Sequence, residues 1–248
     1  MPQQSIKRFG RLPKKSDFRT LRFSDYVKRL PIPPQSYDTL ARVYQGTQIT
    51  DPTQLFPMDS NDQYGDCTIA ALAHATTVYQ AMIGHVDIMA AAEVEKVYFG
   101  LTGGEDTGLN ELDVLKYWRT NAPGGHEILA FVGIDPKNHT HVKQAIQYFG
   151  GVYIGFQVQT NALPDFDAHI EWTPGTLLND GHAVYAVSYD VASVQVLTWG
   201  AVQQGTWAWW DECVQEAYAI LPDAATSAVF CPGFDIAQLQ SDLQQVAA

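Results

Sequence analysis

The stretch that decides the fold is N-D-Q-Y-G-D-C-T-I-A-A, which runs from Asn61 to Ala71. A polar loop containing Gly65 ends at Cys67, and the spacing of the apolar residues predicts a helix over residues 66–84. Cys67 would then lie at a helix N-terminus, where unpaired backbone N–H groups and the helix dipole favour a thiolate. The stretch therefore makes Cys67 a candidate nucleophile, and the alternative for the same residue is a buried structural cysteine.

The composition indicates a folded chain without a disulfide framework. With 248 residues, of which 46% are hydrophobic, the chain can form one large domain or two lobes around a cleft. Its three cysteines show no metal-ligand spacing, and we expect Cys213 and Cys231 to be structural thiols. No cofactor is implied. The N-terminus has no apolar signal-peptide core, and no apolar run reaches the ~18 residues of a membrane span, so we expect neither a Sec signal peptide nor membrane contact.

Charge is distributed unevenly along the chain. The net charge is −12, yet residues 1–42 contain ten of the fifteen Lys and Arg residues and only three acidic ones. The prolines, above all L-P-I-P-P at 30–34, predict an extended basic arm over residues 1–58. Such an arm can dock on the acidic body of its own chain, on a neighbouring subunit or on a polyanion. The acidic body argues against nucleic acid as the ligand of the folded part.

The remaining residues divide into a helical half and a strand-rich half. In residues 59–125 we expect helices over residues 66–84, 88–99 and 109–119, with a loop at 100–104. In residues 126–222 we expect one short helix at 141–149 and strands at 127–134, 152–158, 183–189, 194–199 and 217–221. Residues 223–248 form a predicted tail with a short helix. This order predicts an α+β fold with a site in the cleft between two lobes.

A second candidate for chemistry is His182, in N-D-G-H-A-V-Y-A-V-S-Y. It follows a turn and begins an apolar strand, so a strand starting at the cleft would present its imidazole to Cys67. A thiolate nucleophile and an imidazolium acid would then form a catalytic pair.

Together these residues resemble the papain-like cysteine peptidases, collinearly over about residues 59–221. In that family a glutamine and five further residues precede the catalytic cysteine; here Asn61 takes the place of the glutamine, and Gly65 also matches. His182 and its A-V-Y-A-V strand match the family's histidine strand. The resemblance implies a papain-like two-lobe fold, in which a helical lobe with a central nucleophile helix packs against an antiparallel β-sheet or barrel lobe. It also implies that Asn61 and the Cys67 backbone N–H stabilise an oxyanion.

The resemblance extends to the expected walls of the cleft. It implies that Gly65, Gly103 and Gly104 line the substrate backbone and that Trp199 shields the hydrogen bond of the histidine. The family residue that orients the histidine aligns with Leu197, which has no acceptor. The adjacent Thr198 reaches His182 only if the strand is bulged or the alignment shifts by one residue. Without such a partner, Cys67 and His182 act as a dyad, Asn179 or Asp180 helps, or the site has decayed.

Two functions follow from these residues. The first is a papain-like cysteine peptidase, or a related amide or acyl hydrolase, which acts on a peptide or protein substrate through Cys67, His182 and Asn61. The second is a non-catalytic papain-like structural or accessory protein of a phage virion or similar particle, which assembles with itself or a neighbouring subunit through residues 1–42. The expected location is the cytoplasm, or the virion if the protein is phage-encoded. Under the first function the arm can also be a reduced inhibitory segment that crosses the cleft.

Overall fold

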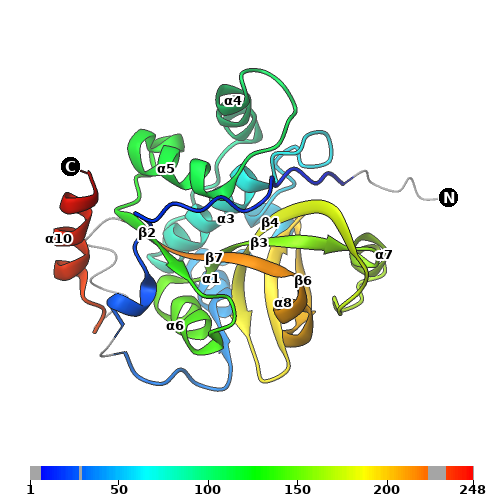
Figure 1. Cartoon of the computed structure of the whole chain (residues 1–248). Helices are drawn as coiled ribbons and strands as arrows, with labels where there is room; N and C mark the ends of the chain where they lie inside the picture. Colours follow the sequence, from blue (N-terminus) through cyan, green and yellow to red (C-terminus); the bar gives the residue numbers. More distant parts are fainter. Residues whose placement is uncertain (1–6, 28–29, 223–232, 248) are drawn as a thin grey trace.

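An antiparallel β-sheet forms the centre of the protein, as seen in a computed structural model that describes residues 7–27, 30–222 and 233–247 (Figure 1). Its strand order is β2-β7-β3-β4-β5-β6, and every neighbouring pair is antiparallel. The strands are β2 (Ala130–Ile134), β3 (Val152–Gln159), β4 (Leu177–Tyr189), β5 (Ser193–Thr198), β6 (Ala201–Thr206) and β7 (Val214–Leu221). A short strand, β1 (Tyr37–Asp38), pairs with the far end of β4.

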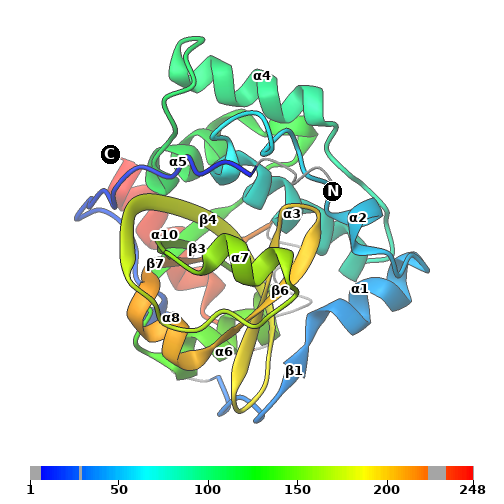
Figure 2. The same cartoon turned by 90° about the vertical axis from the view of Figure 1, so that its right-hand side faces the viewer.

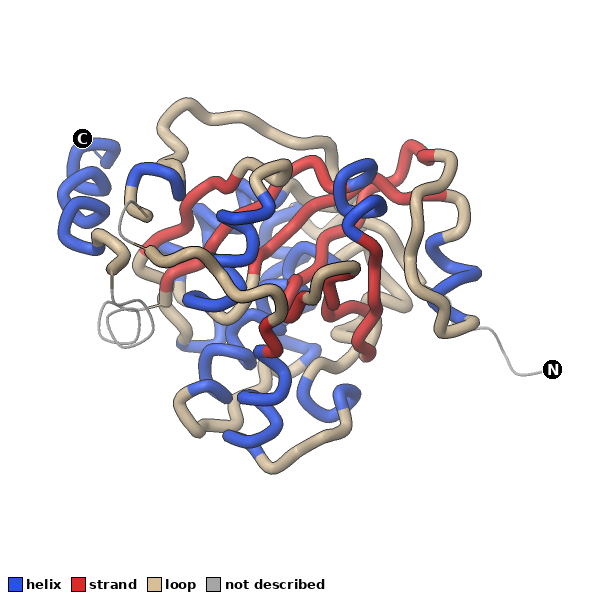
Figure 3. Tube along the Cα trace, turned by 90° about the horizontal axis from the view of Figure 1, so that it is seen from below, coloured by secondary structure: helices blue, strands red, loops and turns tan. Residues whose placement is uncertain are grey.

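Helices cover both faces of this sheet (Figure 3). One face packs against α1 (Thr39–Thr47), α2 (Pro52–Leu55), α3 (Cys67–Met82), α4 (Ala91–Thr102) and α5 (Glu111–Asn121). The other packs against α6 (His139–Phe149), α7 (Ala162–Asp167), α8 (Trp207–Cys213) and α10 (Ile236–Ala247). Two short 3-10 helices, η1 (Phe23–Asp25) and η2 (Pro123–Gly125), complete the elements. Because strand side chains alternate between faces, Val184 and Ala186 of β4 join the second core, and Ala183 and Tyr185 join the first.

The central helix is α3, which lies against β4 and is buried along nearly its whole length (Figure 1). Its sequence of alanines and threonines lets neighbouring elements approach from several sides, and only Gln80 and Met82 are not buried. A helix that is apolar all round belongs in a core. Cys67, its first residue, therefore has a fixed position between the helices and the sheet.

The predicted α+β class is confirmed, and so are most of its elements. The helices expected at 66–84, 88–99 and 109–119 are α3, α4 and α5, each within a few residues of the expected ends. The loop expected at 100–104 is wrong in part, because α4 continues to Thr102 and ends at Gly103, whose φ of 70° suits glycine. Within residues 126–222, α7, β6 and α8 were not predicted.

The extended arm predicted for residues 1–58 is wrong beyond Asp38. Residues 39–55 contain α1 and α2, whose Val43 and Leu55 are fully buried in the same core as α3. The side chains of Asp38 and Asp51 cap these helices by accepting the backbone N–H groups of Ala41 and Thr53. Pro52 stands in the first turn of α2, where a missing N–H costs nothing, so this proline starts a helix instead of preventing one.

Residues 7–12, which we call the crossing segment, lie between the helices α4 and α5 and the sheet in two perpendicular views (Figures 1 and 2). Main-chain hydrogen bonds hold it on both sides. Arg11 N–H donates to the carbonyl of Gly181 at 3.1 Å, whereas Leu109 accepts from Leu12 and donates to Gly10, both at 2.9 Å. The crossing segment is therefore paired with both halves of the molecule at once.

In the part of the chain that the structure describes, no helix combines the length and the apolar character needed to cross a membrane.

A substitution in α2 tests whether residues 39–55 belong to the core. Leu55→Ala removes a fully buried side chain and should lower the free energy of unfolding by about 2–5 kcal/mol. Val191, which is 70% exposed, provides the control, and Val191→Ala should change it by about 0.5 kcal/mol or less. Chemical denaturation of both variants measures the difference. Equal effects would mean that residues 39–55 do not belong to the core.

Candidate active site

Cys67 lies at the N-terminus of α3 and is 1% exposed. Backbone N–H groups from two separate segments, those of Ala183 in β4 and Gly10 in the crossing segment, hydrogen-bond its thiol. Burial raises the pKa of the thiol to about 12, and these two hydrogen bonds lower it by less than burial raises it. With the crossing segment in place, the cysteine is therefore a neutral thiol near neutral pH.

His182 lies in β4, next to the residue whose N–H reaches the thiol, and is also 1% exposed. Its Nε2 lies 2.8 Å from Thr198 Oγ1, and its ring stacks on Trp199 at 4.4 Å with an interplanar angle of 20°. Nδ1, the other ring nitrogen, has no hydrogen-bond partner among the described residues. Burial lowers the pKa of His182 to about 3, so the imidazole is neutral as well. The stacked Trp199 lies where the resemblance to papain-like peptidases implied a shield.

The structure explains how Thr198 reaches His182. The pairing of β5 with β6 is regular from Ser193 to Thr198, so no bulge lies there. Leu197 points into the core that contains α3, and Thr198 therefore lies on the opposite face, which is the face of His182 and Trp199. Thr198, not Leu197, therefore contacts His182, without a bulge in β5. Among the described residues, His182 makes no hydrogen bond to Asn179 or Asp180.

Asn61 is held in the loop that leads to α3 and is 2% exposed. Its side-chain Nδ2 donates to the carbonyl of Tyr64 at 3.0 Å, and its backbone carbonyl accepts the N–H of Arg8 at 2.9 Å. An amide nitrogen carries two protons, and the side chain of Asn61 also hydrogen-bonds the carboxyl of Asp66. The loop thus fixes Asn61 close to the start of α3.

Of the glycines predicted to line the substrate backbone, only Gly65 contacts the crossing segment. A Cβ on Gly10 would lie 1.8 Å from the carbonyl oxygen of Gly65, so the two backbones touch. Gly103 and Gly104 instead end α4, where nothing lies within 4 Å of a Cβ. Main-chain hydrogen bonds to the crossing segment are made by Leu109 instead of Gly103 or Gly104. Sequence reasoning missed Leu109 because any residue type can form main-chain hydrogen bonds.

Sequence reasoning also missed a buried ionic cluster beside the thiol. Arg11 of the crossing segment donates from Nε to Glu111 Oε1 at 2.7 Å and from Nη2 to Glu216 Oε1. All three side chains are at most 2% exposed. Burial raises the pKa of Glu111 well above its usual value; Arg11 opposes this rise, and the neighbouring Glu216 adds to it. One signal was available: Glu216 interrupts the apolar strand V-Q-E-A-Y-A-I-L, where a charge needs a partner.

Two cysteines other than Cys67 were expected to be structural. Cys213 is a buried free thiol at the end of α8, and Cys231 lies outside the described residues. Within residues 7–27, 30–222 and 233–247, no group of three or more His, Cys, Asp or Glu side chains is placed to hold a metal ion.

The fold is that of papain-like cysteine proteases. The structure is similar to that of xylellain, a cysteine protease from Xylella fastidiosa, with a TM-score of 0.65 and 16% identity over 89% of this chain and 98% of that chain. It is also similar to procathepsin B S9 from Trypanosoma congolense, with a TM-score of 0.58 and 14% identity over 87% of this chain and 86% of that chain. No protein-family model and no curated protein matches the sequence. The predicted papain-like two-lobe fold is confirmed, in a chain that has diverged far from these structures in sequence.

The carboxyl of Asp66, the residue that precedes Cys67, provides a test of burial at the site. Burial raises the pKa of Asp66 to about 8, so the folded protein holds this proton more tightly than the unfolded chain does. The stability that the protonated Asp66 provides is complete below about pH 4 and is lost as pH rises through about 8. Asp66→Asn, which stays neutral, should have nearly the melting temperature of the natural protein at pH 4 and exceed it by several degrees at pH 8.

Thermal unfolding at both pH values measures this difference, with Glu105→Gln, at an exposed carboxyl after α4, as the control. A difference in melting temperature that did not change between pH 4 and pH 8 would show that Asp66 is not buried as described.

Proposed function

We propose that the protein is a latent cysteine peptidase, with Cys67 as nucleophile and His182 as general acid and base. One observation supports this most directly. The thiol at the start of α3 accepts the N–H of Ala183, and the neighbouring His182 is held by Thr198 and stacked on Trp199. A structural cysteine needs neither a histidine beside the strand residue that it contacts nor a partner that fixes the ring of that histidine. The similarity to xylellain adds support at the level of the fold.

The proposed reaction begins when a substrate replaces the crossing segment and water reaches the site. The proton of Cys67 passes to His182, and the thiolate attacks the substrate carbonyl, whose π electrons move to oxygen. The Cys67 backbone N–H and the side-chain amide of Asn61, released from Asp66, are the proposed donors to this oxyanion. Collapse of the adduct expels the amine, which takes the proton from His182. Water then hydrolyses the thioester and regenerates the thiol.

Latency follows from the burial of both groups under the crossing segment. Gly10 donates its N–H to the thiol, and the ring of Phe9 lies 5.7 Å from that of His182. In this environment the pKa of Cys67 is about 12 and that of His182 about 3, so the neutral pair is favoured over the ion pair. Displacing the crossing segment restores solvent, which should lower the first value and raise the second. The crossing segment therefore blocks access and also suppresses the thiolate.

Gly10→Ala tests the proposal in the full-length chain. The added Cβ would collide with the backbone of Gly65, which no side-chain rotation can relieve, so the crossing segment should be displaced. We expect the rate of iodoacetamide labelling at Cys67, followed by peptide mass spectrometry at pH 7, to rise by about tenfold or more because more thiolate forms. Hydrolysis of a fluorescent protein substrate should appear in parallel.

The matched control is Gly100→Ala, in α4, where nothing lies within 4 Å of the added Cβ. A second control, Gly10→Ala combined with Cys67→Ala, should show no hydrolysis. If the thiol of Gly10→Ala reacts rapidly but no peptide or ester is cleaved, the peptidase proposal is wrong.

The role of Thr198 as the residue that orients His182 has its own test. Thr198→Val keeps the branched shape and removes the hydroxyl, so Nε2 loses its partner. In the Gly10→Ala background we expect kcat to fall about tenfold or more with little change in KM, because orientation affects the transition state more than substrate binding. Thr198→Ser should restore most of the rate. A fall with Thr198→Ser as large as with Thr198→Val would contradict the role of the hydroxyl.

The assembly role through residues 1–42 stays a prediction. The part of this region that the structure describes binds its own chain through residues 7–12, in agreement with docking on the acidic body. Glu111 and Glu216 belong to that body.

A further inference from the structure

A pocket that holds the side chain of Arg11 lies beside the candidate nucleophile and is built by the folded body. Its acceptors are Glu111 at the first position of α5 and Glu216 and Gln215 on β7. The guanidinium of Arg11 uses three of its nitrogens on three different side chains, with 2.8 Å from Nη1 to Gln215 Oε1. These acceptors match the planar fork of an arginine, which presents five N–H donors in fixed directions.

The acceptors are themselves oriented by other residues of the body. Tyr218 donates its hydroxyl to Glu216 Oε2 at 2.8 Å, and Gln215 donates its amide to Gln157 at 2.9 Å, which leaves its oxygen for the guanidinium. Glu111 keeps one buried carboxylate oxygen, Oε2, without a partner among the described residues. The contacts of Tyr218 and Gln157 to these acceptors come from the folded body, not from the crossing segment.

Two glycines leave room for the occupant. A Cβ on Gly155 would lie 1.8 Å from Glu111 Oε1 and 2.3 Å from Arg11 Nε, so only glycine fits there. A Cβ on Gly181 would lie 2.6 Å from the backbone oxygen of Arg11. Gly181 also accepts the N–H of Arg11 and precedes His182. The same two residues of β3 and β4 therefore admit both the side chain and the backbone of an arginine.

The main-chain contacts of Arg11 are open to any extended peptide. Gly181 accepts the N–H of Arg11, Leu109 bonds the flanking residues Leu12 and Gly10, and these main-chain contacts do not depend on residue type. Gly10, one residue away, donates its N–H to the Cys67 thiol. A peptide that lay in this groove would therefore place a side chain in the pocket close to the carbonyl that Cys67 attacks.

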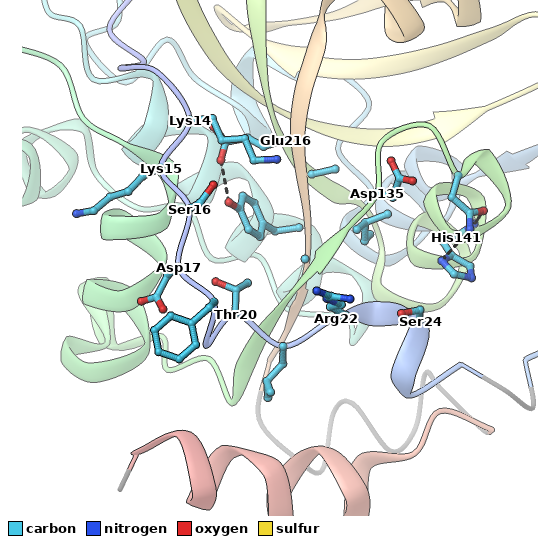
Figure 4. A pocket seen from close by; sticks show the side chains of 17 residues that line it. Lys14, Lys15, Ser16, Asp17, Thr20, Arg22, Ser24, Asp135, His141 and Glu216 are labelled. Carbon is cyan, nitrogen blue, oxygen red and sulfur yellow. Dashed lines mark hydrogen bonds between the residues drawn. The ribbon is translucent and has the colours of Figure 1, made fainter.

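The pocket is covered on one side by residues 14–24 of the N-terminal region. Glu216 lies at one end of a cavity of about 580 Å³ between this stretch and the strands β2 and β7. Figure 4 shows Glu216 next to Lys14 at that end, with its carboxylate hydrogen-bonded inside the cavity. Displacement of the N-terminal region would leave the buried acidic pair, Glu111 and Glu216, without its cation, which is costly unless another cation enters.

We propose that this pocket selects substrates with an arginine next to or near the bond that is cleaved, and that Arg11 occupies it as a mimic of that side chain. This proposal rests on the proposed peptidase function and specifies the substrate class of the same site. Lysine, a single point charge, can satisfy fewer of the three acceptors than arginine. The expected order of preference is therefore arginine, then lysine, then the neutral isostere citrulline.

Binding tests the pocket independently of catalysis. The protein is the full-length chain with Arg11→Ala, which empties the pocket, and with Cys67→Ala, which prevents turnover. Calorimetry compares short blocked peptides that differ only in carrying arginine, lysine or citrulline. We expect arginine to bind about tenfold or more tightly than citrulline, because the charge-assisted hydrogen bonds of the guanidinium are lost in citrulline. If Arg11→Ala does not fold, Arg11→Gln serves in its place, with circular dichroism as the check on folding.

The pocket residues supply the second arm of the test. Glu216→Gln in the same background should remove most of the preference for arginine over citrulline, whereas Glu93→Gln, at a surface carboxyl of α4 that pairs with Lys96, should preserve it. Equal binding of arginine and citrulline peptides, or a preference that survives Glu216→Gln and Glu111→Gln, would overturn the proposal.

Hydrolysis by the Arg11→Ala chain with Cys67 intact separates this proposal from the proposed function. Cleavage without any preference among arginine, lysine and citrulline would support the peptidase proposal and overturn the arginine pocket. Selective binding of arginine peptides without cleavage of any of them would support the pocket and overturn the peptidase proposal.

Discussion

The protonation of the candidate nucleophile depends on one contact, the backbone of residues 7–12 lying over Cys67 and His182. A thiolate and an imidazolium are stable together only where water or fixed dipoles solvate both charges. Here the helix N-terminus and two N–H groups favour the thiolate, yet the absence of solvent raises the pKa of the thiol to about 12. Burial therefore outweighs the dipole and hydrogen bonds that the position at the head of α3 provides. The crossing segment is one of the elements that bury Cys67, and burial keeps the thiol neutral.

Two different physical effects keep this contact in place. Gly10 and Gly65 let the two backbones approach to a distance that excludes any Cβ, which gives the contact its shape. Arg11 adds charge, because Glu111 and Glu216 would otherwise be buried without a cation. Breaking a buried ion pair by removing one partner commonly costs about 3–5 kcal/mol, since the remaining charges stay desolvated. Displacement of the segment therefore needs either a competing cation in the pocket or water that reaches both carboxylates.

The candidate site residues that the sequence could single out are those that depend on residue type. Cys67 stands at the start of an apolar helix, and His182 begins an apolar strand, so pattern and spacing made both of them candidates. Thr198 was assigned only as an alternative, because the choice between it and Leu197 depends on which face of β5 each occupies, and an alignment does not fix that face. The contacts of Leu109 and Gly181 use main-chain atoms, which any residue supplies. The ionic cluster joins residues about 100 and 205 positions apart, and no local pattern connects them.

The ionic cluster of Arg11, Glu111 and Glu216 shows how the basic N-terminal region binds the acidic body. The basic N-terminal region forms several ion pairs with the body, and those at the surface, such as Lys15 with Asp113, are about half exposed. Pairs of this kind contribute little and are screened by salt. Arg11 differs because its partners lie out of water, where the effective dielectric is low and the geometry of the guanidinium matters. General attraction between a basic segment and an acidic body can bring the two together, but it does not determine which residues pair. The ion pairs of Arg11 with Glu111 and Glu216 determine this, and Arg11 directly follows Gly10, the residue at the thiol.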